Sequence, residues 1–406
     1  MIECLGVYMN LKLKSKKVIN KIIVIFNTLF YYLVPLSNKK ILFVSYHGKG
    51  YLCNPKAIHQ YMSQCEDYRD FQFVWALKKG HYVNIPNAKV VRYNSLQYFY
   101  YLARSKYWIF NCKMPGYLRK KKNQIYLQTW HGTPLKRLAH DINIKEGATF
   151  YRSRMSHEQM THTYNEDRKK YDYFLSSNSF ATEKFISAFK INPDKILEVG
   201  YPRNDFLTQV TLDEIENLKN KYDIPLTKKV ILYAPTWRDN SFNERDYVHE
   251  VQVNFSLWKQ QLGEEYVVIY KPHYLIVNYF NETELDGFLY PIAANIDINE
   301  LYVISDVLVT DYSSVFFDYA ILNRPILFYM YDLLHYEHEL RGFYLDVNTD
   351  LPGAIITEEA SLLHQLQNID HYQEENAYKL KQFNANYNEL QTGDCAKKVV
   401  ESIIRI

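Results

Sequence analysis

Short apolar runs alternate with amphipathic stretches along the first half of the chain. The runs have the composition of buried strands and cover Ile41–Ser45, Phe71–Leu77, Val90–Tyr93, Trp108–Asn111, Ile125–Trp130, Tyr173–Ser176 and Leu197–Gly200. Helices are predicted between several of them, at Pro55–Gln64, Leu96–Ala103 and Thr182–Ala188. Strands that alternate with helices in this way are typical of a parallel sheet that is covered on both faces.

The same alternation starts again after a connector at Leu207–Thr227, which contains a charged helix predicted at Leu212–Tyr222. The second series has strands at Val230–Ala234, Val267–Lys271, Val307–Val309 and Ile326–Tyr329, and helices near Phe255–Leu262, Ile298–Ser305 and Ser314–Leu322. Asp141–Lys170 predicts a polar loop or loose helix over the site, and the tail Tyr378–Ile406 is helical in pattern.

Two successive series of this kind predict an α/β fold with two doubly wound, Rossmann-like domains. We expect a terminal segment over residues 1–37, a first domain over 38–205 and a second over 206–406. Ligands of such sheets bind beyond the carboxyl ends of the strands, so polar residues at those ends are the candidates for chemistry.

The N-terminal segment combines a basic cluster with the apolar stretch Ile22–Leu36. The stretch is short for a helix that spans a membrane, which needs about 20 apolar residues. It favours a helix that lies on the anionic inner face of a membrane. The alternative is a buried first helix of the domain, and a single-pass anchor is the weaker third interpretation.

Composition narrows the class of protein further. A length of 406 residues suggests more than one domain, and a net charge of only +3 does not indicate a nucleic-acid-binding protein. The 5 cysteines are scattered and form no C-x-x-C pair, which argues against a disulfide framework or a zinc site and favours a reducing cytoplasm.

The stretch Val307–Tyr329 predicts a compact βαβ unit whose first loop ends at a helix N-terminus. Unpaired backbone N–H groups and a partial positive charge make such a terminus suitable for a phosphate. The loop contains Thr310, Asp311, Ser313 and Ser314, and the two serines could cap the helix or donate to the same anion. A well-capped core helix is the alternative.

A second polar cluster follows the strand that begins at Ile125. His131 is placed at the strand end, and its ordinary pKa near 6.5 suits it to take a proton from a hydroxyl. Gly132 and Thr133 come next and could bring backbone N–H groups to a phosphate. The alternative is a turn histidine that is hydrogen-bonded locally.

Basic residues stand at three other predicted strand ends or turns. Lys271 and His273 offer a positive charge and a donor to an anionic leaving group, although either could be ordinary surface. Arg238 could bind a phosphate or pair with a carboxylate. Arg203 lies in a predicted hinge turn and would bind substrate if it faced the cleft.

Several familiar motifs are missing from the sequence. It contains no G-x-x-x-x-G-K-[ST], G-x-G-x-x-G, G-x-S-x-G or H-E-x-x-H. Asp311 has no D-x-D partner, and the His and Glu residues at His335, Glu337, His338 and Glu339 are interpreted as surface residues or as residues that support a site from behind, so neither a metal nor another cofactor is predicted.

Taken together, the clusters resemble the CDP-glycerol glycerophosphotransferase family of teichoic-acid primases and polymerases. The matching stretches are QTWHGTPLK (Gln128–Lys136), VGYPRND (Val199–Asp205), ILYAPTWRD (Ile231–Asp239), YKPH (Tyr270–His273), TDYSSVFFDYAILNRPILFY (Thr310–Tyr329) and RGFYLD (Arg341–Asp346). Each is modest alone, but their collinear order is specific.

The resemblance implies a GT-B fold and transfer of glycerol phosphate from CDP-glycerol to a hydroxyl of a lipid-linked glycan or polyol-phosphate acceptor, with release of CMP. It implies that His131 is the base and that His273 serves the donor diphosphate. It further implies that Ser313, Ser314 and Arg238 contact the donor. Family members work at the cytoplasmic face of the membrane, so the anionic inner membrane surface is an expected partner.

The chain has about the length of the family's core, which favours a primase or a capsule-type transferase over a long-chain polymerase. Two alternatives stay open from the sequence. One keeps the fold with another donor, either CDP-ribitol or a nucleotide sugar. The other is a non-catalytic, membrane-associated scaffold.

Overall fold

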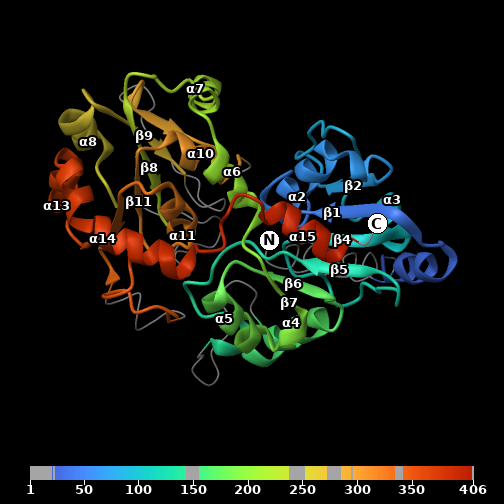
Figure 1. Cartoon of the computed structure of the whole chain (residues 1–406). Coiled ribbons are helices and arrows are strands. Elements are labelled where there is room, and N and C mark those ends of the chain that lie inside the picture. Colours follow the sequence, from blue (N-terminus) through green and yellow to red (C-terminus); the bar gives the residue numbers. More distant parts are fainter. Residues whose placement is uncertain are drawn as a thin grey trace, which may run out of the picture. The chain divides into compact units, whose positions relative to one another are not determined.

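The computed structural model describes residues 21, 23–142, 155–236, 252–271, 285–293, 296–333 and 342–404 (Figure 1). The chain divides into two compact units. The first unit comprises residues 1–131, 165–174 and 403–406, and the second comprises residues 132–164 and 175–402.

The first sheet has the strand order β3-β2-β1-β4-β5-β6-β7. Its strands are β1 (Ser37–Val44), β2 (Gln72–Leu77), β3 (Ala88–Arg92), β4 (Ser105–Phe110), β5 (Ile125–Gln128), β6 (Tyr173–Ser176) and β7 (Ile196–Glu198). All the pairings among the six strands β1 to β6 are parallel. The order reverses between β1 and β4, and open α/β sheets bind ligands at such a point.

The second sheet repeats this plan with the order β10-β9-β8-β11-β12-β13. Its strands are β8 (Lys229–Ala234), β9 (Tyr266–Tyr270), β10 (Leu289–Pro291), β11 (Val307–Thr310), β12 (Ile326–Tyr329) and β13 (Ile355–Ile356). All of these pairings are parallel, and the order reverses between β8 and β11. The predicted doubly wound α/β class is therefore confirmed.

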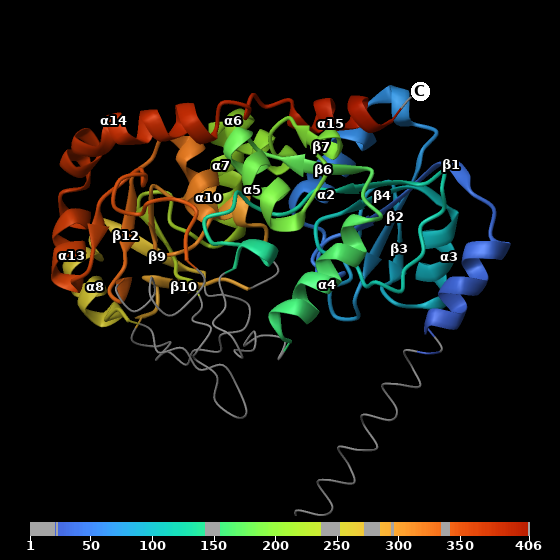
Figure 2. The ribbon, with the colours of Figure 1, turned by 90° about the horizontal axis from the view of Figure 1, so that it is seen from below.

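Helices connect the strands in both series. They are α2 (Cys53–Gln64), α3 (Leu96–Arg104), α4 (His157–Arg168), α5 (Ser179–Phe189), α6 (Asp205–Gln209), α7 (Leu212–Lys221), α8 (Phe255–Leu262), α10 (Ile298–Ile304), α11 (Val315–Tyr319), α13 (Glu359–Gln367), α14 (Ile369–Tyr387) and α15 (Cys395–Ile403). α8 and α13 lie side by side (Figure 2), and the indole of Trp258 donates to Glu359 across them at 2.9 Å.

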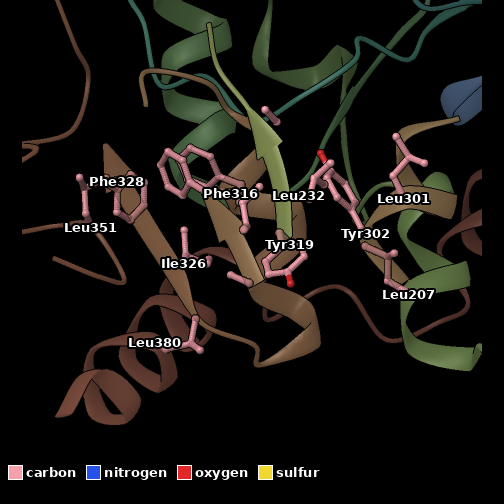
Figure 3. Close-up of a cluster of buried hydrophobic side chains, with 14 of the residues drawn as sticks. Leu207, Leu232, Leu301, Tyr302, Phe316, Tyr319, Ile326, Phe328, Leu351 and Leu380 are labelled. Carbon is pink, nitrogen blue, oxygen red and sulfur yellow. The ribbon is translucent and has the colours of Figure 1, made fainter. Parts of the chain in front are cut away.

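Apolar strands and helix faces of the second unit enclose a continuous core. Leu232 and Ile326 come from the sheet, while Leu301, Phe316 and Leu380 come from helices that pack on it (Figure 3). These side chains are almost fully buried, and each contributes about 1.5–3 kcal/mol by leaving water. The core fixes the strand ends from which the polar loops emerge.

Several predicted boundaries need correction. The short strands β10 and β13 were not predicted, because two or three residues carry no readable alternation. The helix α13, with nine residues, was also not predicted. Within the segment predicted as a loop or loose helix, His157–Arg168 is a helix. The helical tail begins earlier, at Ile369, and breaks between Tyr387 and Cys395.

Residues 23–33 form a helix before β1. One side of it packs on the rest of the first unit, where the Asn27 amide donates to the carbonyl of Tyr117 at 3.0 Å and Phe30 meets the ring of Tyr100 edge-on. The other side is apolar and exposed, with Ile25 at 63% and Leu33 at 69%. Within the described residues, no helix is long and apolar enough to cross a membrane.

Candidate functional site

His131 stands three residues beyond the end of β5, as the sequence predicts. Its Nδ1 lies 2.7 Å from the carbonyl oxygen of Asn111, which follows β4. A carbonyl oxygen only accepts, so Nδ1 of the neutral ring carries the hydrogen and Nε2 keeps the lone pair. The half-buried ring is thus oriented as a general base requires.

The loop that carries His131 is held from several sides. The buried amide of Asn54 on α2 donates to the carbonyls of Thr129 at 3.1 Å and Trp130 at 3.3 Å. Trp130 adopts a left-handed φ of 49°, and its indole stacks on the His131 ring at 4.4 Å. Such strain persists only where surrounding contacts impose it, and here it fixes the position of the imidazole.

Gly132 and Ser314 meet within the second unit. A Cβ on Gly132 would lie 3.2 Å from Ser314 Oγ and 3.8 Å from the guanidinium of Arg203, so the absence of a side chain permits this close approach. Thr133 is buried, and its hydroxyl lies 2.8 Å from that of Ser177. The structure therefore brings together three of the predicted site residues, Gly132, Ser314 and Arg203.

Arg203 is 9% exposed and forms an ion pair with Asp318 on α11, with a nitrogen–oxygen distance of 2.5 Å. The second oxygen of Asp318 accepts from the amide of Asn204 at 2.8 Å. The Asn299 amide donates to the Arg203 carbonyl at 2.6 Å. These contacts join the turn Pro202–Asn204 to α10 and α11, so Arg203 supports the loop that carries Ser314.

Thr310 and Asp311 occupy the point where the strand order of the second sheet reverses. Thr310 Oγ1 donates to the carbonyl of Ala234 at 2.8 Å, and Asp311 Oδ1 accepts from the backbone N–H of Thr236 at 2.7 Å. Both predicted site residues are buried. Their contacts hold the loop after β8 against the loop after β11, so they shape this edge of the sheet.

Lys271 follows β9, again at a carboxyl end. Its half-buried ammonium donates to the carbonyl of Ala293 at 2.6 Å. Burial lowers the pKa of Lys271 to about 8, while the nearby carboxylate of Asp297 acts in the opposite direction. The side chain is therefore a positive charge at neutral pH whose proton is held only weakly.

The helix after Ser313 and Ser314 is shorter than predicted. α11 covers Val315–Tyr319 and continues as a 3₁₀ turn at Ala320–Leu322. The predicted serine cap is wrong for Ser314, whose side chain makes no capping bond, while Ser313 Oγ lies at 3.4 Å from the N–H of Val315. A five-residue helix has a small dipole, so any anion site here depends mainly on local N–H and O–H groups.

Arg238 and His273 lie outside the described residues, as does the segment that contains His335, Glu337, His338 and Glu339. In the part of the chain that the structure describes, no group of His, Cys, Asp and Glu side chains has a metal-binding arrangement.

The structure adds residues that the sequence analysis did not select. His47 and Gly48 follow β1 just as His131 and Gly132 follow β5, so the same pattern at a strand end was present in the sequence. Asp318 gave no signal, because a single carboxylate in a helix resembles any surface residue. Only the fold shows that it is buried beside Arg203.

Comparison with known proteins decides the family. Residues 25–405 match the model of the CDP-Glycerol:Poly(glycerophosphate) glycerophosphotransferase family. The chain belongs to this family. It is therefore a CDP-glycerol glycerophosphotransferase, and the resemblance predicted from its motifs is confirmed.

Individual relatives of this glycerophosphotransferase agree with the assignment. The teichoic acid poly(glycerol phosphate) polymerase of Bacillus spizizenii is 40% identical, over 92% of this chain and 93% of its own length. The teichoic acid glycerol-phosphate transferase of Staphylococcus aureus is 38% identical, over 93% of this chain and 96% of its own length. A polymerase and a transferase thus match at similar length, so length does not separate the two activities.

The fold of the glycerophosphotransferase matches a solved relative as well. The structure of the wall teichoic acid polymerase TagF superimposes with a TM-score of 0.86 at 34% identity, and covers 98% of this chain and 97% of its own. The predicted GT-B type of fold is thereby confirmed.

Proposed function

We propose that the chain transfers glycerol phosphate from CDP-glycerol to a hydroxyl of a lipid-linked acceptor, at the cytoplasmic face of the membrane, with His131 as the base. Family membership supports the donor and the type of reaction. The observation that carries the role of His131 is its hydrogen bond to Asn111, which leaves Nε2 as the acceptor of a proton.

In the proposed step, the acceptor oxygen attacks the β-phosphorus of CDP-glycerol while its proton passes to His131 Nε2. The new phosphorus–oxygen bond joins glycerol phosphate to the acceptor. The bond between the β-phosphorus and the bridging oxygen breaks, and that oxygen leaves with CMP. The proton then returns from His131 to solvent, so the enzyme ends the cycle unchanged.

Positive groups of the second unit are proposed to hold the donor. Lys271 supplies a positive charge beyond β9, and the neutral hydroxyls of Ser313 and Ser314 add hydrogen bonds to the diphosphate beyond β11. Arg238 and His273 are proposed to complete the set on the basis of their motifs. Phosphoryl transfer depends largely on such positioning and on offsetting the charge of the departing group.

The helix over residues 23–33 supports the proposed membrane location. Its exposed side chains Ile25, Leu29, Tyr32 and Leu33 recur at helical spacing. Arg119 lies beside Tyr32, with a nitrogen–oxygen distance of 3.4 Å. An apolar helix face bordered by basic groups suits the interface of an anionic membrane.

The test offers the purified protein CDP-glycerol, CDP-ribitol and UDP-sugars in the presence of membranes and identifies the nucleotide released. The proposal predicts CMP from CDP-glycerol and incorporation of glycerol phosphate into the membrane fraction. CMP only with CDP-ribitol would assign the alternative donor, and release of a nucleoside diphosphate would assign a sugar transferase. Absence of any cytidine nucleotide binding would favour the scaffold.

A further inference from the structure

A single buried amide reaches both sides of the contact between His131 and Asn111. Gln128 is the last residue of β5 and is 0% exposed. Its Nε2 donates to the carbonyl of Cys112 at 3.1 Å, and its Oε1 accepts from the backbone N–H of Trp130 at 3.0 Å. These two groups belong to the residue after Asn111 and to the residue before His131, so Gln128 is bonded to the chain neighbour of each partner.

The chemistry of its two backbone partners fixes the orientation of this amide. A backbone carbonyl only accepts and a backbone N–H only donates, so Nε2 must face Cys112 and Oε1 must face Trp130. Nε2 also donates to the hydroxyl of Tyr126 at 3.1 Å. Three hydrogen bonds therefore hold the side chain of Gln128 in one orientation, and their loss would leave buried polar groups without partners.

The carboxylate of Asp167 on α4 supports the same arrangement. Asp167 is 0% exposed, and its Oδ2 accepts from the backbone N–H of Met114 at 3.0 Å. The hydroxyl of Tyr126, which accepts from Gln128, donates to the same oxygen at 3.5 Å. The chain that follows β4 is therefore held at two points, one by Gln128 and one by Asp167.

The turn that carries His131 depends on such contacts. Trp130 has a left-handed φ of 49°, which is unfavourable for a residue with a side chain, and the bond from its N–H to Gln128 helps to maintain it. The carbonyl of Asn111 must stay at 2.7 Å from Nδ1 of His131 if the ring is to keep its hydrogen on that nitrogen. A shift of either chain segment would lengthen this contact and allow the imidazole to take the other tautomer.

We propose that Gln128 is a positioning residue, which keeps the His131 ring against the Asn111 carbonyl and so keeps Nε2 ready to accept a proton. This inference rests on the proposed function of His131. Gln128 acts through His131 and does not touch the reacting atoms. Loss of its amide should therefore slow the transfer step and leave the binding of CDP-glycerol unchanged.

The experiment compares Gln128→Met with Gln124→Met in the full-length protein. Methionine has nearly the shape of glutamine but lacks the amide. Gln124 is the matched control, because it is also buried and its amide donates to two backbone carbonyls, at 2.8 and 2.7 Å, and accepts from one backbone N–H at 2.8 Å. It stands directly before β5, whereas Gln128 ends this strand. The two substitutions thus remove similar bonds, but only Gln128→Met removes them beside His131.

Urea unfolding should show a similar loss of stability in the two variants. Only Gln128→Met should lower kcat for transfer from CDP-glycerol, by about tenfold, the order of effect expected from one orienting hydrogen bond, while KM for CDP-glycerol stays unchanged. Gln128→Asn is a second variant for the case that Gln128→Met does not fold, because it keeps an amide that is too short to reach both partners. A fall in kcat of the same size in Gln124→Met would indicate a general loss of packing and overturn the inference.

NMR of isotope-labelled histidine ring nitrogens separates this inference from the proposed function, because it reads the tautomer without turnover. His131→Ala identifies the signals of His131. Wild type and Gln124→Met should show one tautomer with the hydrogen on Nδ1, and Gln128→Met should show a mixture of both tautomers. Such a mixture without a fall in kcat would support Gln128 as the positioning residue and contradict His131 as the base. A single unchanged tautomer in Gln128→Met would overturn the inference, even if His131→Ala abolishes transfer.

Discussion

Nδ1 of His131 lies 2.7 Å from the carbonyl oxygen of Asn111, and this contact fixes the chemical state of the ring. The carbonyl accepts the hydrogen on Nδ1, so Nε2 is left with its lone pair. The indole of Trp130, stacked at 4.4 Å, restricts rotation of the imidazole. A base that is held in one tautomer and one orientation needs little rearrangement before it takes a proton.

Lys271 should make donor affinity depend on pH. Burial lowers its pKa to about 8, so the side chain is charged at pH 7 and mostly neutral at pH 9. KM for CDP-glycerol should rise across this interval, because the neutral amine no longer attracts the diphosphate. Lys271→Arg keeps its charge and should flatten the rise. A parallel pH profile in wild type and Lys271→Arg would exclude Lys271 as the cause.

Asp318 should contribute strongly to stability. Asp318→Ala leaves the buried charge of Arg203 without its carboxylate and removes the contact to Asn204, which should cost about 3–5 kcal/mol. Urea unfolding measures this cost. The control is Lys39→Ala, which breaks the solvent-exposed pair with Asp70 and should change the free energy of unfolding far less. Similar costs for both variants would contradict a structural role for Asp318.

His59 should make the fold sensitive to acid. Burial lowers its pKa from the ordinary 6.5 to about 4, and the ring lies between the hydroxyls of Tyr51 and Ser63. The folded state therefore favours the neutral ring. Stability is fully present above about pH 6.5 and falls as the pH drops toward 4, by on the order of 3 kcal/mol for this group.

Denaturant unfolding at pH 7, 5.5 and 4 tests the role of His59. His59→Gln should be less stable than wild type at pH 7, but its stability should decline less steeply toward pH 4. His47, whose pKa burial also lowers to about 4, adds a similar acid dependence to both proteins. An equally steep decline in wild type and His59→Gln would contradict the assignment.

The apolar helix face should determine membrane binding. Ile25→Glu combined with Leu33→Glu removes two exposed apolar side chains and should weaken binding to anionic vesicles by about tenfold or more. Leu212→Glu is the matched control, because Leu212 is 78% exposed on α7, in the second unit. Vesicle sedimentation measures the membrane binding of the double variant and of the control. Equal loss of binding, or no loss, would place the membrane contact elsewhere.

The sequence was sufficient to predict the doubly wound class and most strands, because long apolar runs such as Ile41–Ser45 are the strongest local signal. It failed at β10 and β13, which have too few residues to show a period. Their positions depend on pairing with β9 and β12, a tertiary property.

The residues of the candidate site were likewise predicted only in part from the sequence. His131 and Lys271 were recognisable as polar residues directly after buried strands. Asp318 was not, because its role depends on burial beside Arg203, more than a hundred residues away in the chain.

The most direct test of the account compares wild type, His131→Ala and His364→Ala in single-turnover transfer from CDP-glycerol, with donor binding measured separately. His364 is an exposed histidine on α13 and serves as the control. His131→Ala should bind CDP-glycerol normally and transfer glycerol phosphate about 10²–10⁴ times more slowly, while His364→Ala matches wild type. Near-normal transfer by His131→Ala would contradict the assignment of His131 as the base.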